Sequence, residues 1–171
     1  MNKIQRPDDE ILNLQGIYFD ELGDAKRSEK AYLEADRATS TWGGPLFNLA
    51  LSFRKRGLHD KALETINRAI KKIGRKGPYL TLKAMCLASL EDEDEKRKAL
   101  SDAMHSFDPP EILDDWELGW YTTAADLFGD DEYISKAKKE NKKRRKTGMS
   151  LVDDDVLRPA VSGDLVKKES L

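Results

Sequence analysis

The sequence has one cysteine, two histidines and no long apolar run, and each scarcity excludes a class of protein. Cys86 alone cannot form a disulfide within the chain, which favours a reducing compartment. His59 and His105 lie far apart and do not make a metal-ligand spacing with Cys86, so we expect no metal and no other cofactor. Because no stretch is apolar enough to span a bilayer and no secretory signal is visible, we expect a cytoplasmic protein.

Motifs that carry catalytic chemistry are also missing. The sequence has no glycine-rich phosphate loop, no G-x-S-x-G and no H-E-x-x-H. The acidic run at Asp153–Asp155 is too irregular for a calcium loop. We therefore expect a protein that is not an enzyme. The formal net charge of -2 also argues against a chain built as a polycation for nucleic acid.

The clearest pattern that is present is a pair of amphipathic helices between Leu46 and Gly74. Apolar residues recur at three- and four-residue spacing in each half, as they do along one side of a helix. Gly57 is predicted to end the first helix and Asp60 to open the second. The apolar sides consist of Leu46, Leu49, Ala50 and Phe53 in the first helix, and Ala62, Ile66, Ala69, Ile70 and Ile73 in the second.

This helical hairpin recurs at a spacing of about 34 residues in both directions along the chain. Towards the N-terminus the matching positions are Leu12, Gly16, Phe19, Gly23, Tyr32 and Ala35. Towards the C-terminus they are Leu80, Ala84, Leu87, Leu100 and Ala103. Agreement over three units at one period predicts a repeat architecture, in which each unit contacts only its neighbours.

The spacing resembles the tetratricopeptide repeat (TPR), with a large apolar, a small and an aromatic residue in the first helix and Ala, aromatic, Ala in the second. Ser28 and Lys96 depart from it, each standing where Ala is usual. The resemblance implies an all-α, right-handed superhelix of about four hairpins that binds a protein or peptide, as an adaptor or scaffold does. The implied solenoid spans 9–146, with repeats near 9–42, 43–76, 77–110 and 111–146 after a lead at 1–8.

The fourth hairpin and the chain ends are predicted from local signals. Pro110-Glu111 is expected to open its first helix, Gly129 to end it, and Asp130 or Asp131 to cap the second helix. The fourth repeat continues into a basic helix extension. Residues 147–171 lack sustained periodicity and are predicted to form a mostly flexible tail that adds little stability.

In the TPR family the first helix of each hairpin lines the concave groove, so the resemblance implies where a peptide binds. Asn48 stands where many TPRs carry an asparagine that grips a ligand backbone; the alternative is that it bonds a neighbouring helix. Trp116 and Trp120 share one helix face, and packing between hairpins is the alternative to binding. The predicted peptide-binding residues are Asn13, Ile17, Phe47, Asn48, Leu51, Leu82, Met85 and Trp120.

Two further observations concern the partner. Some TPRs clamp a C-terminal carboxylate, but the basic pair of that clamp would fall on Pro78 and Leu82, so an apolar partner segment is favoured. The tail's own apolar residues are one candidate for that segment. The basic run 136–146 suggests a different function, attachment to nucleic acid, although no aromatic residue is interleaved for base stacking. The favoured interpretation of this run is a solvated last helix whose positive charge lies at the negative end of the helix dipole.

Overall fold

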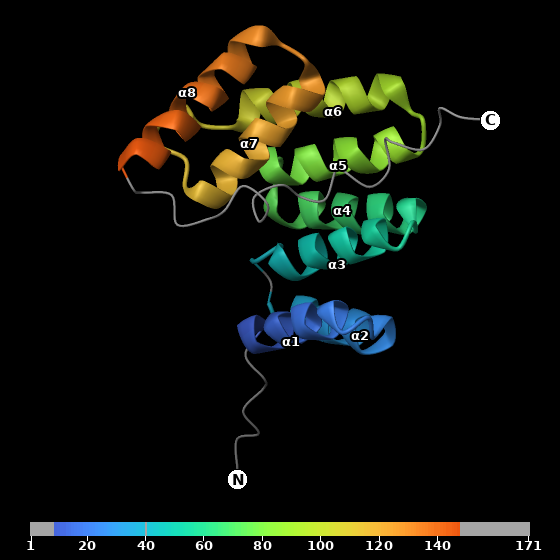
Figure 1. The fold of residues 1–171 in the computed structure, drawn as a ribbon. Coiled ribbons are helices and arrows are strands. Elements are labelled where there is room, and N and C mark those ends of the chain that lie inside the picture. The colour runs from blue at the N-terminus through green and yellow to red at the C-terminus, as the bar shows by residue number, and fades with distance from the viewer. Residues whose placement is uncertain (1–8, 40, 148–171) are drawn as a thin grey trace, which may run out of the picture.

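The computed structural model describes residues 9–39 and 41–147, and over these residues the chain forms eight helices (Figure 1). The predicted tail begins at Thr147, the last residue of the eighth helix, and residues 148–171 lie outside the described residues, as does the lead 1–8. The helices are α1 (Asp9–Glu21), α2 (Ala25–Ala38), α3 (Gly44–Lys55), α4 (His59–Ile73), α5 (Gly77–Ser89), α6 (Glu93–Ser106), α7 (Asp115–Phe128) and α8 (Asp131–Thr147).

The helices pair into four hairpins that stack one on another (Figure 1). Each odd-numbered helix contacts the even-numbered helix that follows it, and each even-numbered helix up to α6 contacts the next hairpin. α7 lies against α5 as well as α6. Its contact with α5, the first helix of the preceding hairpin, is more extensive than the contacts of α3 with α1 or of α5 with α3. The predicted all-α stack of four hairpins is confirmed.

The repeat positions predicted from the sequence form the core. The large apolar residues Leu12, Leu46 and Leu80 are buried, and the small residues of the second helices, Ala35, Ala69 and Ala103, have no exposed surface. Small side chains allow the two helices of a hairpin to approach closely. In the first hairpin a Cβ atom added at Gly16 would stand 2.5 Å from the Tyr32 ring, so α1 and α2 require glycine there.

The turns within the hairpins use left-handed backbone conformation. Gly23 and Gly57 have φ angles of 74° and 73°, which favour glycine and end α1 and α3. Glu91 occupies the equivalent turn of the third hairpin and adopts a φ of 59°. The acidic run 91–95 is therefore a turn followed by the start of α6, where Asp92 accepts a hydrogen bond from Glu95 N at 3.2 Å.

The start of the fourth hairpin was predicted too early. Residues 110–113 form a turn, and α7 begins at Asp115 instead of at Glu111. The reason is capping, because the Asp114 side chain accepts a hydrogen bond from Glu117 N at 2.7 Å. The predicted cap of α8 is confirmed for Asp130, whose Oδ1 accepts from Glu132 N at 2.9 Å.

The buried side chains form two apolar clusters along the stack. The first spans the first three hairpins and includes Trp120 of α7. The second joins α5, α6, α7 and α8 around Leu100, Leu118 and Ala124. Leu63, Phe107 and Leu127 touch both clusters and connect them. Among the described residues, no helix has the length and apolar content that a membrane crossing requires.

Candidate functional site

The first helices α1 and α3 meet through polar side chains. Asn48 Nδ2 donates to Asn13 Oδ1 at 3.0 Å; Asn13 is buried and Asn48 is partly exposed. One turn further along, the Ser52 hydroxyl donates to Asp20 Oδ1, and Lys55 Nζ lies 3.8 Å from Asp20 Oδ2. The alternative interpretation of Asn48, a bond to a neighbouring helix, is therefore what the structure shows.

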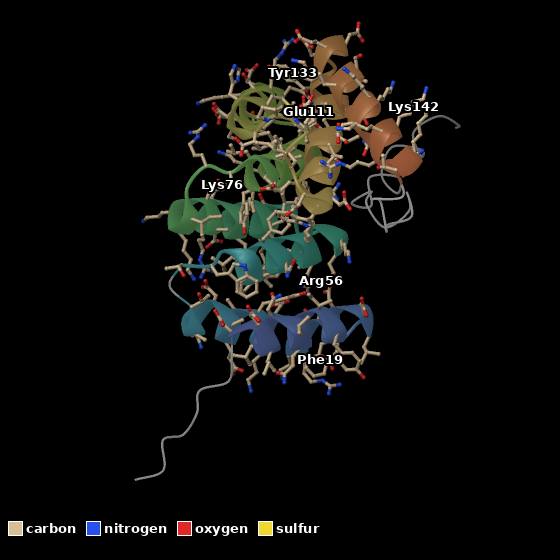
Figure 2. The ribbon with its side chains drawn as sticks, turned by 90° about the vertical axis from the view of Figure 1, so that its left-hand side faces the viewer. Phe19, Arg56, Lys76, Glu111, Tyr133 and Lys142 are labelled. Atoms are coloured by element: carbon tan, nitrogen blue, oxygen red, sulfur yellow. The ribbon has the colours of Figure 1, made fainter. Side chains whose placement is uncertain are left out.

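Ion pairs from α2 to the end of α3 and to α4 reinforce this junction. Arg56 Nη1 pairs with Glu29 Oε1 at 2.7 Å, and Figure 2 shows Arg56 between the first and second hairpins. Lys72 Nζ lies 2.7 Å from Asp36 Oδ1 and also donates to the carbonyl oxygens of Asp36 and Thr39. Because these groups are only partly exposed, their contacts are less screened than ordinary surface pairs.

The predicted apolar strip comes together but is covered. Phe47, Leu82, Met85 and Trp120 belong to one buried cluster, each with 8% or less of its surface exposed. The Phe47 ring packs edge-on against Trp120 and Trp116 of α7, with centroid distances of 5.1 and 5.6 Å. A ligand would reach these residues only after displacing the side chains that cover them, so here they support the surface instead of forming it.

The accessible part of the predicted site is smaller. Ile17 and Leu51 are partly exposed and pack against the same cluster, about one turn beyond Asn13 and Asn48 respectively. Trp116 is 48% exposed and rests on Phe47. The sequence could not separate the two tryptophans, because four-residue spacing places both on one helix face whichever of them is covered.

Three solved structures resemble this stack of hairpins. The TPR2B domain of yeast Sti1, in complex with pHsp70, is 20% identical with a TM-score of 0.56, over 77% of this chain and 97% of that one. MamA is 14% identical with a TM-score of 0.57, over 83% of each chain. MamA from Desulfovibrio magneticus RS-1 is 15% identical with a TM-score of 0.52, over 85% of this chain and 78% of that one.

The chain has a TPR fold. No family model and no curated protein matches the sequence, so the likeness rests on structure and on the repeat positions described above. At these identities it shows the fold alone.

Part of the basic run 136–146 makes contacts within the fold. The Arg144 side chain is 13% exposed and pairs with Glu140 at 3.0 Å and Asp115 at 2.8 Å. Its Nη2 also donates to the carbonyl oxygens of Pro110 and Leu113, at 3.2 and 2.7 Å. Arg144 therefore fastens α8 to the turn before α7, a contact that was not predicted from the sequence.

We expect Arg144→Ala to lower the free energy of unfolding by about 2 kcal/mol, because it removes charge-assisted hydrogen bonds and leaves the buried Glu140 carboxylate with fewer partners. The hydrogen bond from Arg144 holds the pKa of Glu140 below its ordinary value. This contribution is therefore complete above the unfolded pKa of about 4.3 and is lost as the pH falls through the lower folded pKa.

The measurement is urea denaturation of wild type and Arg144→Ala at about pH 7 and about pH 3. Their difference in stability should shrink at the acidic pH. Lys139→Ala, at an exposed position of the same helix, is the control and should match wild type at both. Equal stability of wild type and Arg144→Ala at neutral pH would contradict the fastening role.

Two surfaces of the TPR fold were not predicted from the sequence. One is a groove of about 610 Å³ between α7 and α8, lined by Gly119, Thr122, Ala137, Lys138 and Lys142 among others. The other is a set of exposed apolar residues on and just after α1, consisting of Ile11, Leu14, Tyr18 and Leu22. Their three- and four-residue spacing is the signal that could have revealed this second surface.

The described residues offer little reactive chemistry. Burial raises the pKa of the Cys86 thiol to about 12, so it stays protonated and unreactive at neutral pH. Within residues 9–39 and 41–147, no group of three or more His, Cys, Asp or Glu side chains is placed to hold a metal ion.

Proposed function

We propose that this chain is a non-catalytic protein-interaction module that holds an extended partner segment on the face formed by α1 and α3. The observation that carries this proposal is the Asn13–Asn48 pair, a partly exposed amide junction beside two partly exposed apolar residues, Ile17 and Leu51. Trp116 stands at the α7 side of the same face, because it touches Phe47 of α3. We call the surface made by Ile17, Asn48, Leu51 and Trp116 the amide face.

The chemistry of the amide face suits an extended polypeptide with apolar side chains. An asparagine amide both donates and accepts, as a peptide backbone does, so one side chain can make two hydrogen bonds to one residue of a ligand. Ile17, Leu51 and Trp116 supply apolar area, and tryptophan is a frequent centre of binding energy. The Sti1 TPR2B domain, solved in its complex with pHsp70, supports the general idea that this fold holds a polypeptide.

The test is affinity capture from native lysate with the full chain and with Leu51→Glu. We expect the variant to lose at least about nine-tenths of the captured partner, since an apolar ligand would have to desolvate the new carboxylate. Leu51 packs partly on the core, so the variant's circular dichroism and melting must first show that it is folded. Asn48→Ala should weaken capture in the same direction.

Ile112→Glu is the matched control, because Ile112 is 70% exposed and is not one of the four residues of the amide face. It should retain the partner at wild-type level. A second comparison uses Lys138→Glu with Lys142→Glu on the basic helix. If this pair loses the partner while Leu51→Glu keeps it, binding lies on the basic end of the protein and the amide face is the wrong site.

A further inference from the structure

We propose that copies of this chain associate head to tail, with the exposed apolar side of α1 in one copy docked into the groove between α7 and α8 of the next. The two surfaces lie at opposite ends of the stack. Figure 2 shows Phe19, which belongs to α1, at one end, and Lys142, which belongs to α8, at the other. This association uses neither Leu51 nor Trp116 and is independent of the amide face.

The first surface is a continuous apolar stripe. Its members recur every three or four residues, so they lie along one side of α1 and the turn that follows it. That side is nearly opposite to the one bearing Asn13 and Asp20, which bond to α3. The stripe consists of Ile11, Leu14, Tyr18 and Leu22, which are 53%, 63%, 58% and 59% exposed, and we call it the α1 stripe.

The repeat shows what such a stripe contacts. One repeat later the same positions are Pro45, Asn48, Ser52 and Arg56. Asn48, Ser52 and Arg56 all bond to the preceding hairpin, through Asn13, Asp20 and Glu29. Two repeats later Tyr79, Leu82 and Cys86 are buried. In α3 and α5 this side of the helix therefore faces the hairpin before it, and the α1 stripe is one half of such an interface.

The groove between α7 and α8 is the other half. Gly23 and Gly129 end the first helices of the first and last hairpins with φ angles of 74° and 77°, and they align these two hairpins. In this alignment Asn13 corresponds to Gly119 and Asp20 to Asp126, both of which line the groove. In the first hairpin, Asn13 and Asp20 bond to the hairpin that follows. The groove is therefore the surface on which a hairpin following the fourth one would dock.

Charge matches the two surfaces. α1 contains no lysine or arginine, and Glu10 and Glu21 flank the stripe on one side. The groove is lined by Lys138, Lys142, Arg145 and Lys146, against a single carboxylate, Asp126. An acidic helix with an apolar stripe is thus the occupant whose charge fits this groove.

One cross-copy ion pair can be specified from the repeat. Asp36 of α2 pairs with Arg68 of α4, with Oδ2 and Nη2 3.4 Å apart. Aligning the turn glycines places Lys142 where Asp36 stands, and moving one repeat back places Glu34 where Arg68 stands. Lys142 is basic where Asp36 is acidic, and Glu34 is acidic where Arg68 is basic. An ion pair of opposite polarity can therefore form between Lys142 of one copy and Glu34 of the next.

The contrast between the two ends favours a second copy as the occupant. An open solenoid needs polar outer faces on its terminal units, and α8 meets this need with its many lysines. α1 does not, since its outward side carries the apolar stripe. A helix whose charge fits the groove is therefore present in the same chain, at the end where the described residues provide no polar cover.

The experiment measures the mass of the full chain in solution by sedimentation, from about 10 µM to about 1 mM. Head-to-tail contacts let each copy bind two others, so the average mass should rise with concentration beyond that of two chains. Leu14→Asp with Tyr18→Asp disables the stripe, and Thr123→Trp with Lys142→Glu fills and recharges the groove. Each double variant alone should be monomeric. An equimolar mixture should form a dimer, because one intact stripe and one intact groove remain.

Ile112→Asp is the matched control and should associate like wild type, since Ile112 is exposed but outside both surfaces. If a double variant fails to fold, the proposed ion pair between Lys142 and Glu34 provides the test. Lys142→Glu should weaken association at least about tenfold, and Glu34→Lys in the same chain should restore it. A wild type that stays monomeric, a groove variant that still dimerises, or a mixture that remains monomeric would each overturn head-to-tail association. If another segment of the chain or another protein occupied the groove, the wild type would stay monomeric.

Discussion

Ala62→Asp is expected to lower the free energy of unfolding by about 3–5 kcal/mol, the usual cost of an uncompensated buried charge. Ala62 has no exposed surface and sits in the first cluster beside Ala50 and Ile66. Ala62 belongs to α4, which packs against α3, so a carboxylate there would lose its water and would also disturb the packing of the two helices. For a protein of ordinary stability this change removes a large part of the total.

Ala88→Asp is the matched control, because it makes the same substitution at an exposed helical position. It lies near the C-terminal end of α5, where a negative charge costs about 0.3–1 kcal/mol. Thermal and urea unfolding of both variants, followed by circular dichroism, measures the difference. If Ala62→Asp unfolded together with Ala88→Asp, the helix crossing would not lie where the repeat places it.

The fold was predictable because a repeat presents the same physical problem several times. Each hairpin must bring two helices together, so Gly16, Ala50 and Ala84 are small and buried at equivalent positions. The turns are equally regular, with Gly23 and Gly57 at positive φ. What local signals did not show was the start of α7, because Glu111 and Asp115 are both plausible first-turn residues and only the bond to Asp114 decides between them.

The candidate site was less predictable, because a helix face is covered or exposed according to elements far away in the sequence. Phe47, Leu82 and Met85 have the spacing of a groove-lining strip, but α7 reaches back past the third hairpin to α3, and Trp120 joins the cluster in which they are buried. The polar contact between neighbouring hairpins was easier to predict, because it joins residues at related positions of adjacent repeats. Asn13 and Asn48 stand nearly one repeat apart, and the structure joins them directly. Within the basic run, Arg144 makes contacts with Asp115 and the turn before α7 that the local sequence does not reveal.

The two tryptophans of α7 should respond very differently to truncation. Trp120→Ala is expected to cost about 3–5 kcal/mol of stability, as large core truncations do. Trp120 is 5% exposed, and its ring meets Phe47 at 5.1 Å and Trp116 at 6.3 Å. Removing the indole would leave a cavity where α7 packs against α3, and each lost aromatic contact is worth about 0.5–1.5 kcal/mol beyond its buried area.

Trp116→Ala is the matched variant, with the same residue replaced one turn earlier. Because Trp116 is 48% exposed, its truncation should cost less than about 1.5 kcal/mol, mainly through its edge contact with Phe47. Capture of a partner should show the reverse order, since only Trp116 belongs to the amide face. Urea unfolding and partner capture on both variants therefore separate structure from binding. Equal loss of stability in the two would mean that Trp116 is covered, and an unaffected Trp120→Ala would mean that α7 does not hold α3.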